Sequence, residues 1–202
     1  MDWFVCQQTG RFVSIIRQKG EICMEKKEDR RVTMTRRLLK DALTDILRTE
    51  DIYHVSIREL CQRADVNRTT FYKYYGNQFD LLADMENDLL EFLVSTIREH
   101  AANPVKIIET ICEYLESHLE FGRLIVNNNV DPLFPQRLFA QEVLRESVMQ
   151  NYGTMPDKTA QEYLFNYVIY GAYRIICLWI NKEQREPPEE IAQLLIRLIR
   201  IN

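Results

Sequence analysis

The residues best suited to chemistry lie between positions 68 and 75, which read Arg-Thr-Thr-Phe-Tyr-Lys-Tyr-Tyr. An arginine can donate two hydrogen bonds to a guanine edge, and a threonine can contact a thymine methyl group. Tyrosine and lysine side chains reach phosphate oxygens. On a short helix, one face would carry these groups: Arg68, Thr69, Tyr72 and Lys73. The aromatic residues Phe71, Tyr74 and Tyr75 would face the core at least in part, although a plain surface helix would show the same pattern.

A second short helix precedes this one. Ser56-Ile-Arg-Glu59 has the form of a capping box, in which Ser56 accepts from a backbone amide and Glu59 reaches back. Residues 65–67 then form a tight turn, and Asn67 is a good N-cap for the next helix. Two short helices joined by such a turn predict a helix-turn-helix, whose second helix enters the DNA major groove.

Residues 64–82, which read ADVNRTTFYKYYGNQFDLL, resemble the signature of TetR-family transcriptional regulators. That signature runs roughly A-G-V-S-x-x-T-[LF]-Y-x-[HY]-F-x-[SN]-K-x-x-L. The resemblance covers about residues 30–90. It implies an N-terminal three-helix domain, whose first helix coincides with the apolar stripe between Thr33 and Thr49.

The resemblance also implies roles for single residues. Ser56 matches a phosphate-contacting position, and Arg58 falls where some members read a base. Arg68 and Thr69 take the variable, sequence-reading positions. Thr70, Tyr72 and Tyr74 match phosphate- and sugar-contacting positions, and Lys73 lies at the helix end near the DNA backbone. The full DNA-contacting set implied is Ser56, Arg58, Asn67, Arg68, Thr69, Thr70, Tyr72, Lys73, Tyr74 and Gln78.

Two positions depart from the family pattern. Gln78 replaces a phosphate-binding lysine, so fewer counterions are released and binding is expected to be weaker and less salt-sensitive. Asp65 replaces the usual turn glycine, but aspartate tolerates the left-handed region, so the turn is expected to survive. Arginines near the first helix either add phosphate contacts or form a solvated charged run. These are Arg30, Arg31, Arg36 and Arg37.

The N-terminal segment 1–29 lacks a sustained helical period. Met24 directly precedes a charged run, and Lys19-Gly20-Glu21 can be encoded by a purine-rich stretch that resembles a bacterial ribosome-binding site. We therefore hypothesise that translation begins at Met24 and that residues 1–23 are not native. A genuine N-terminal arm is the alternative, and the intact mass of the native protein distinguishes the two.

Composition favours an all-α fold. The chain has 202 residues with only 6 Gly and 6 Pro, and 46% of its residues are hydrophobic. We expect the helix-turn-helix domain at residues 30–80 and a helical dimerisation and effector domain at residues 81–202.

The two parts of the chain differ in charge. The net charge of −4 is the sum of +3 over residues 1–80 and −7 over residues 81–202. Further helices are expected near residues 78–100, 104–120, 136–151, 156–181 and 188–201.

The segment 163–180 is apolar on nearly every face, so it needs burial on two sides. Arg174 and Asn166 argue against a membrane span. A homodimer would supply the second side, unless the last two helices simply complete one core. The interface residues expected are Leu164, Tyr167, Val168, Gly171, Ile175, Leu194, Leu195 and Leu198. An effector pocket could be lined by some of Phe92, Leu115, His118, Phe121, Phe134, Phe139, Tyr167 and Tyr170, which could equally be core.

Other chemistry finds no support in the sequence. The five cysteines are scattered without a C-x-x-C pair, so we expect reduced thiols, no metal site, no cofactor and a cytoplasmic location. Motifs for nucleotide binding or hydrolysis are absent, so no enzyme is expected.

The resemblance implies a ligand-responsive transcriptional regulator, most often a repressor, that binds double-stranded operator DNA as a homodimer. An activator or co-regulator that acts through a partner protein, and a ligand-binding dimer without DNA binding, remain alternatives.

Overall fold

The computed structural model describes residues 21–127, 130–153 and 155–199. All regular elements within these ranges are helical, which confirms the predicted all-α class. The chain divides into two compact units, residues 1–37 and residues 38–202, and each is considered by itself. The hypothesis about residues 1–23 falls almost entirely outside the described residues and stays a prediction.

Helix α1 (Glu21–Leu47) begins in the first unit, well before Thr33, where the apolar stripe predicted its start. The physical reason is local, because residues 21–47 contain neither Gly nor Pro and are rich in Glu, Lys, Arg and Met, which favour helix. Arg30, Arg31 and Arg37 are exposed on this helix.

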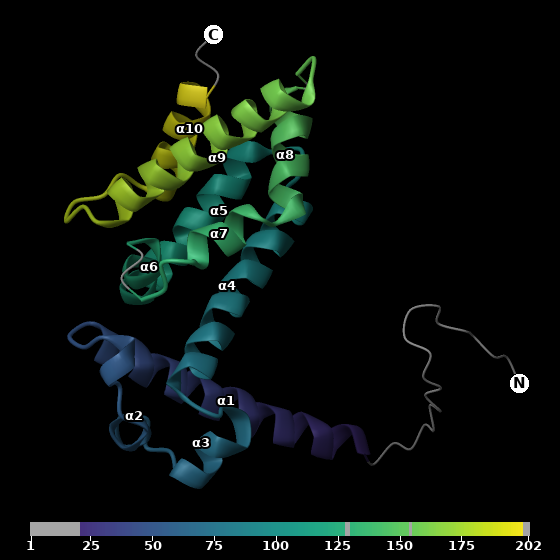
Figure 1. Cartoon of the computed structure of the whole chain (residues 1–202). Coiled ribbons are helices and arrows are strands. Elements are labelled where there is room, and N and C mark those ends of the chain that lie inside the picture. The colour runs from purple at the N-terminus through teal and green to yellow at the C-terminus, as the bar shows by residue number, and fades with distance from the viewer. Residues whose placement is uncertain (1–20, 128–129, 154, 200–202) are drawn as a thin grey trace, which may run out of the picture. The chain divides into compact units, whose positions relative to one another are not determined.

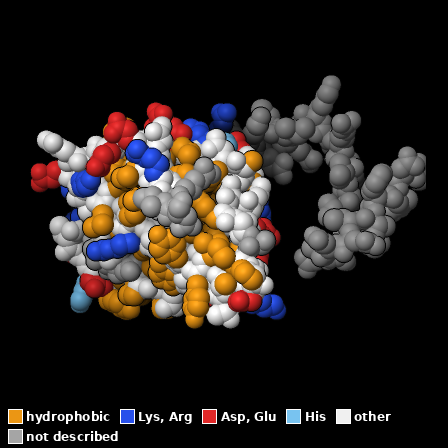
Figure 2. Space-filling model, turned by 90° about the horizontal axis from the view of Figure 1, so that it is seen from above, with side chains coloured by type: hydrophobic (Ala, Val, Ile, Leu, Met, Phe, Trp, Pro, Cys, Tyr) orange, Lys and Arg blue, Asp and Glu red, His pale blue; other side chains and the backbone are white. Residues whose placement is uncertain are grey.

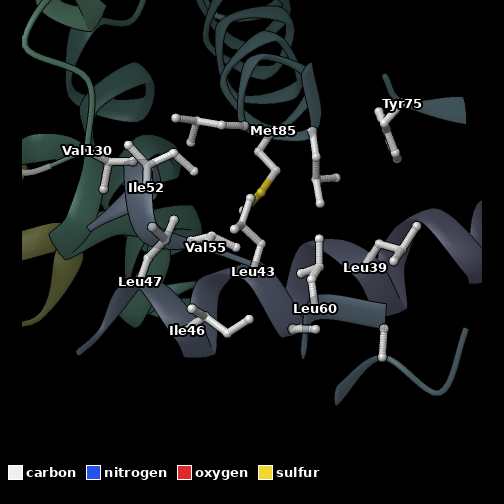
Figure 3. Packing of buried hydrophobic residues seen from close by; sticks show 14 of the residues in the cluster. Leu39, Leu43, Ile46, Leu47, Ile52, Val55, Leu60, Tyr75, Met85 and Val130 are labelled. Carbon is white, nitrogen blue, oxygen red and sulfur yellow. The ribbon is translucent and has the colours of Figure 1, made fainter. Parts of the chain in front are cut away.

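The second unit begins with the remainder of α1, the short 3-10 helix η1 (Ile52–His54), α2 (Ile57–Arg63) and α3 (Arg68–Tyr74). Their apolar faces meet in one cluster (Figure 3). Leu39, Leu43 and Ile46 from α1 are fully buried there, as are Leu60 from α2 and Phe71 from α3. This core fixes the orientation of the two short helices against α1.

Helix α4 (Gln78–Glu99) runs from these N-terminal helices into the C-terminal half of the unit (Figure 1). At its first turns, Lys40 Nζ lies 2.7 Å from Asp84 and 2.5 Å from Asp88. The Tyr75 hydroxyl donates to Asp84 at 2.8 Å. Met85 packs into the N-terminal core. The two halves of this unit therefore share one continuous helix.

The C-terminal half consists of helices α5 to α10. Sequence patterns placed single helices over 104–120 and 136–151, whereas the structure breaks each in two. The first break lies at His118, where the Ser117 hydroxyl donates to the Tyr114 carbonyl at 2.8 Å. Neither break contains Gly or Pro, so the sequence carried no ordinary stop signal. The bounds are α5 (Pro104–Ser117), α6 (Leu119–Val126), α7 (Phe134–Phe139), α8 (Glu142–Tyr152), α9 (Lys158–Ile180) and α10 (Pro188–Ile199).

Helix α9 is long and apolar enough to cross a membrane, with a mean hydropathy of 1.2 over its most apolar window. One such helix is weak evidence for a membrane protein, because helices of soluble proteins also meet this criterion. Only 28% of that window is buried in the protomer. Much of this apolar helix is therefore not fully buried by the described residues.

Candidate nucleic-acid interface

Helix α3 begins after Asn67, the N-cap that the sequence predicted. The Asn67 carboxamide oxygen accepts from the backbone N–H and from the hydroxyl of Thr69, both at 3.0 Å. Phe71 is fully buried and anchors the inner face. The outer face exposes the groups suited to base edges and phosphates, Arg68, Thr69, Tyr72 and Lys73. The helix is therefore fixed by its core while its polar side faces outward.

The turn between α2 and α3 also forms as expected. Asp65 adopts a φ of 52°, in the left-handed region that aspartate tolerates. The Val66 N–H donates to the Cys61 carbonyl at 2.9 Å, which closes the turn. Cys61 is buried, and burial raises the pKa of its thiol although the charge of Arg68 opposes this shift. A buried, protonated thiol fits a structural role for Cys61.

The predicted capping box at the start of α2 is wrong. Ser56 is the N-cap residue, but its side chain makes no capping hydrogen bond. Glu59 instead accepts from its i+4 neighbour Arg63 at 2.9 Å. An arginine one turn later competes for the carboxylate, which the four-residue motif does not reveal. Ser56 and Arg58 are both exposed at this helix start.

The start of α4 is capped by Asn77, which accepts from the backbone N–H groups of Phe79 and Asp80 at 2.8 and 3.1 Å. Gln78 is half-buried, and its side-chain amide donates to the Ile52 carbonyl at 3.4 Å. It thus bridges α4 to η1 in addition to any phosphate contact. The C-cap of α3 is Tyr75. A Cβ at Gly76 would lie 2.9 Å from Asp80 Oδ2, so a larger residue there would require the Asp80 side chain to shift.

Two exposed aromatic residues beside Gln78 were not predicted. Tyr53 from η1 and Phe79 from α4 are 76% and 40% exposed, and their rings meet edge to face at 5.3 Å. Tyr74 is half-buried, with Lys73 Nζ 5.7 Å from its ring centre. The exposed pair joins segments 26 residues apart in sequence, so no local spacing could have indicated it.

A second site lies in the C-terminal half, where an apolar cavity of about 160 Å³ opens between α4 and α10. Of the aromatic and aliphatic residues suggested for an effector pocket, Leu115, Phe134 and Phe139 line it. Tyr167 and Tyr170 are exposed instead. The remaining three residues do not line the cavity. Phe92 and His118 both stack on Tyr114, and Phe121 packs at the edge of the N-terminal core.

The expected interface residues on α9 and α10 separate into two groups. Val168 and Leu195 are buried inside the protomer, and Leu164 and Ile175 are half-buried. The outer face carries the rest: Tyr167, Gly171, Leu194 and Leu198. Three further exposed residues share the α9 stripe without having been predicted, Tyr163, Tyr170 and Leu178. A helix that is apolar on every side does not reveal its phase, which explains the difference.

A capped recognition helix in a helix-turn-helix, joined by one long helix to a helical half with an apolar cavity, defines a DNA-binding regulator. Residues 102–201 match a family model, TetR_C_8, described as the C-terminal region of transcriptional regulators. The chain belongs to the TetR family of transcriptional regulators.

Two sequence relatives of this chain are also transcriptional regulators by name. The chain is 24% identical over 169 residues to the uncharacterized HTH-type transcriptional regulator YxbF of Bacillus subtilis (strain 168), a match that covers 80% of this chain and 43% of YxbF. It is 31% identical over 61 residues to DhaS, the dhaKLM operon transcriptional activator of Lactococcus lactis subsp. lactis (strain IL1403), which covers 30% of this chain and 33% of DhaS. The chain thus spans less than half the length of these two relatives.

The fold is shared with a TetR transcriptional regulator from Streptococcus agalactiae 2603V. The TM-score is 0.63 at 18% sequence identity, and the match covers 87% of this chain and 98% of that one.

Proposed function

We propose that this regulator binds a pseudo-palindromic operator as a homodimer in the cytoplasm and represses nearby genes until a small-molecule effector releases it. One observation carries the proposal: α3 is capped by Asn67 and anchored by Phe71, so that its polar face is presented outward on a rigid core. Because phosphate contacts set the register and base-edge contacts set the sequence, the helix has what each task needs. Arg68 and Thr69 are assigned to bases.

A homodimer is supported by the outer face of α9 and α10. The side chains of three tyrosines on α9, Tyr163, Tyr167 and Tyr170, are between 52% and 72% exposed. Leu178 on the same helix is 54% exposed. In Figure 2, which views the end of the second unit that carries these helices, hydrophobic side chains gather in a broad patch among charged ones. Such a patch favours association. In a twofold dimer, recognition helices about 34 Å apart meet successive major grooves.

The effector response is proposed to pass through α4. Its first turns belong to the N-terminal core, through Leu81, Leu82 and Met85, and its later turns line the cavity, through Leu89 and Leu93. A ligand that binds one orientation of α4 better than another shifts the population toward that orientation. The spacing of the two recognition helices changes with it, and only one spacing fits the operator.

The experiment is a binding assay with labelled DNA fragments from the region upstream of the protein's own gene. Wild-type protein is expected to select one fragment, and R68A is expected to lose that selection. R48A is the matched control, because Arg48 is exposed and pairs with Glu120 away from α3. If the wild type prefers no fragment, or if R68A keeps the preference, the proposal fails, and ligand binding without DNA binding would then mark a dimer of another function.

An activator is the second candidate, because DhaS is named as an activator. The neutral amide at Gln78 also suits a protein that relies on a partner to hold DNA. Deleting the gene distinguishes the two. Transcription of the neighbouring genes rises if the protein is a repressor and falls if it is an activator.

A further inference from the structure

The cavity in the C-terminal half is lined by side chains from α4 to α10, and its wall contains no charged side chain. Aliphatic and aromatic groups make up nearly all of it. Leu93, Ile111, Phe134, Val168 and Ile176 represent the helices that meet there. An ion bound in this space would have no counter-charge, and burial of an unpaired charge is strongly unfavourable.

Three hydroxyl groups supply the polar side-chain atoms of the wall, those of Ser147, Tyr152 and Tyr173. The Tyr173 hydroxyl donates to the Val126 carbonyl at 3.0 Å. Burial raises the pKa of Tyr173, so this hydroxyl stays protonated and neutral. Ser147 and Tyr152 both lie on α8. The wall thus has few polar side-chain atoms, which suits a ligand with at most one hydroxyl or carbonyl group.

The size of the cavity limits the ligand further. Its volume is about 160 Å³. An engineered apolar cavity of about 150 Å³ in another protein stays dry and binds benzene. A molecule of one ring, of roughly six to ten non-hydrogen atoms, is therefore the size that fits without rearrangement. A long acyl chain would have to extend beyond this volume.

We propose that the cavity binds a small, uncharged, mostly hydrocarbon molecule about one ring in size, with at most one hydroxyl or carbonyl group. The proposal rests on the effector-responsive function above and names the class of its ligand. It excludes carboxylates, ammonium compounds and long-chain lipids as the primary ligand. Such ligands would require charges or length that this wall does not provide.

The test is isothermal titration of the full-length protein with matched ring compounds at neutral pH. Toluene and benzyl alcohol represent the neutral class, benzoate and benzylammonium the charged class, and 1-dodecanol the long-chain class. We expect the neutral rings to bind at least 100-fold more tightly than either charged ring. Dodecanol is expected to bind more weakly than benzyl alcohol.

Variants with larger side chains in the cavity wall test whether the ring compounds bind in this cavity. A172F places a ring into the space from α9, and S147L fills it more gently from α8, in case the first variant fails to fold. Both are expected to weaken benzyl alcohol binding at least 10-fold. A140F is the matched control, since Ala140 is exposed and does not line the cavity. Unchanged binding in the filled variants would overturn the proposal.

Equal binding of benzoate or benzylammonium, tighter binding of dodecanol, or no binding of either neutral ring would also overturn it. Failure of the proposed function is a separate result, because operator affinity is measured without any ligand. If benzyl alcohol binds in the cavity but DNA is never bound, the ligand class stands and the regulatory function falls. If the protein binds operator DNA but binds no ring compound, the regulatory function stands and the proposed ligand class falls.

Discussion

Glu86 on α4 and Arg137 on α7 form an ion pair. The side chain of Glu86 is only 3% exposed, whereas that of Arg137 is 45% exposed. The same guanidinium lies 2.8 Å from Asp131. Glu86 Oε1 has no hydrogen-bond partner among the described residues. Burial raises the pKa of Glu86 to about 7, Arg137 opposes that shift, and the nearby Asp131 adds to it. The pair joins α4, which packs into the N-terminal core, to α7, which lines the cavity.

The raised pKa predicts a pH dependence of stability. Because the folded-state pKa of Glu86 exceeds the unfolded value of 4.5, stability is full below that value and declines as the pH rises toward 7. E86Q removes this titration and should reduce the difference in unfolding free energy between pH 5 and pH 8 by at most about 3 kcal/mol. Urea unfolding at the two pH values measures it. E91Q, an exposed change on the same helix, is the control, and an unaltered pH dependence in E86Q would refute the assignment.

Asn67 is predicted to serve both folding and binding, and two substitutions separate the roles. N67A removes the cap on α3 and should cost about 1 kcal/mol of unfolding free energy. N67D keeps an acceptor at the cap and should preserve stability, while its negative charge weakens DNA binding. N77A, which removes the equivalent cap on α4, is the matched control for the stability effect. Wild-type operator affinity in N67D would show that Asn67 does not face the phosphates.

Arg68 and Tyr72 are predicted to differ in kind. R68A removes a base contact and should relax specificity at one operator position, with a loss of about 1–3 kcal/mol there. Y72F removes a phosphate contact and should weaken all sequences evenly. Competition binding against operator variants measures both. If neither substitution changes operator affinity, α3 is not the recognition helix.

Gln78 offers a gain-of-function prediction. Q78K introduces the charge that the family usually has at the start of α4, and should tighten DNA binding. One additional phosphate contact steepens the slope of log affinity against log salt by about 0.9. Q78E is the control of similar size and opposite charge, and should weaken binding. A slope that Q78K leaves unchanged would place this residue away from the phosphates.

The dimer is predicted to depend on the outer stripe of α9. Y167D places a charge at a residue that is 67% exposed and centred on that stripe, and should produce monomers with reduced operator affinity. Analytical ultracentrifugation measures the oligomeric state. L133D is the control, because Leu133 is a similarly exposed apolar residue that lies at the start of α7 and not on α9. A dimer that survives Y167D would assign association to another surface.

Local chemistry explains what the sequence predicted well. The start of α3, the Asn67 cap and the left-handed Asp65 each depend on residues within a few positions of one another. The buried face of α3 followed from its spacing in the same way. The family resemblance supplied the roles of these residues, which no spacing could provide.

Long-range contacts explain what was missed. Glu86 pairs with an arginine 51 residues away, and nothing near Glu86 in the sequence indicates that it is buried. The exposed pair of Tyr53 and Phe79 likewise depends on the packing of η1 against α4. On α9, both faces are apolar, so the sequence could not show that Val168 faces inward while Tyr163 faces outward. Each of these features required the tertiary structure.

The central claim is that α3 reads DNA through a few placed charges, and a salt titration tests it most directly. Affinity for the preferred fragment upstream of the protein's own gene is measured from about 50 to about 200 mM salt, beside a scrambled fragment of equal length. We predict that affinity falls with salt for both fragments, with tighter binding of the preferred fragment at every salt concentration. Binding that is absent, independent of salt or equal for the two fragments would contradict the account.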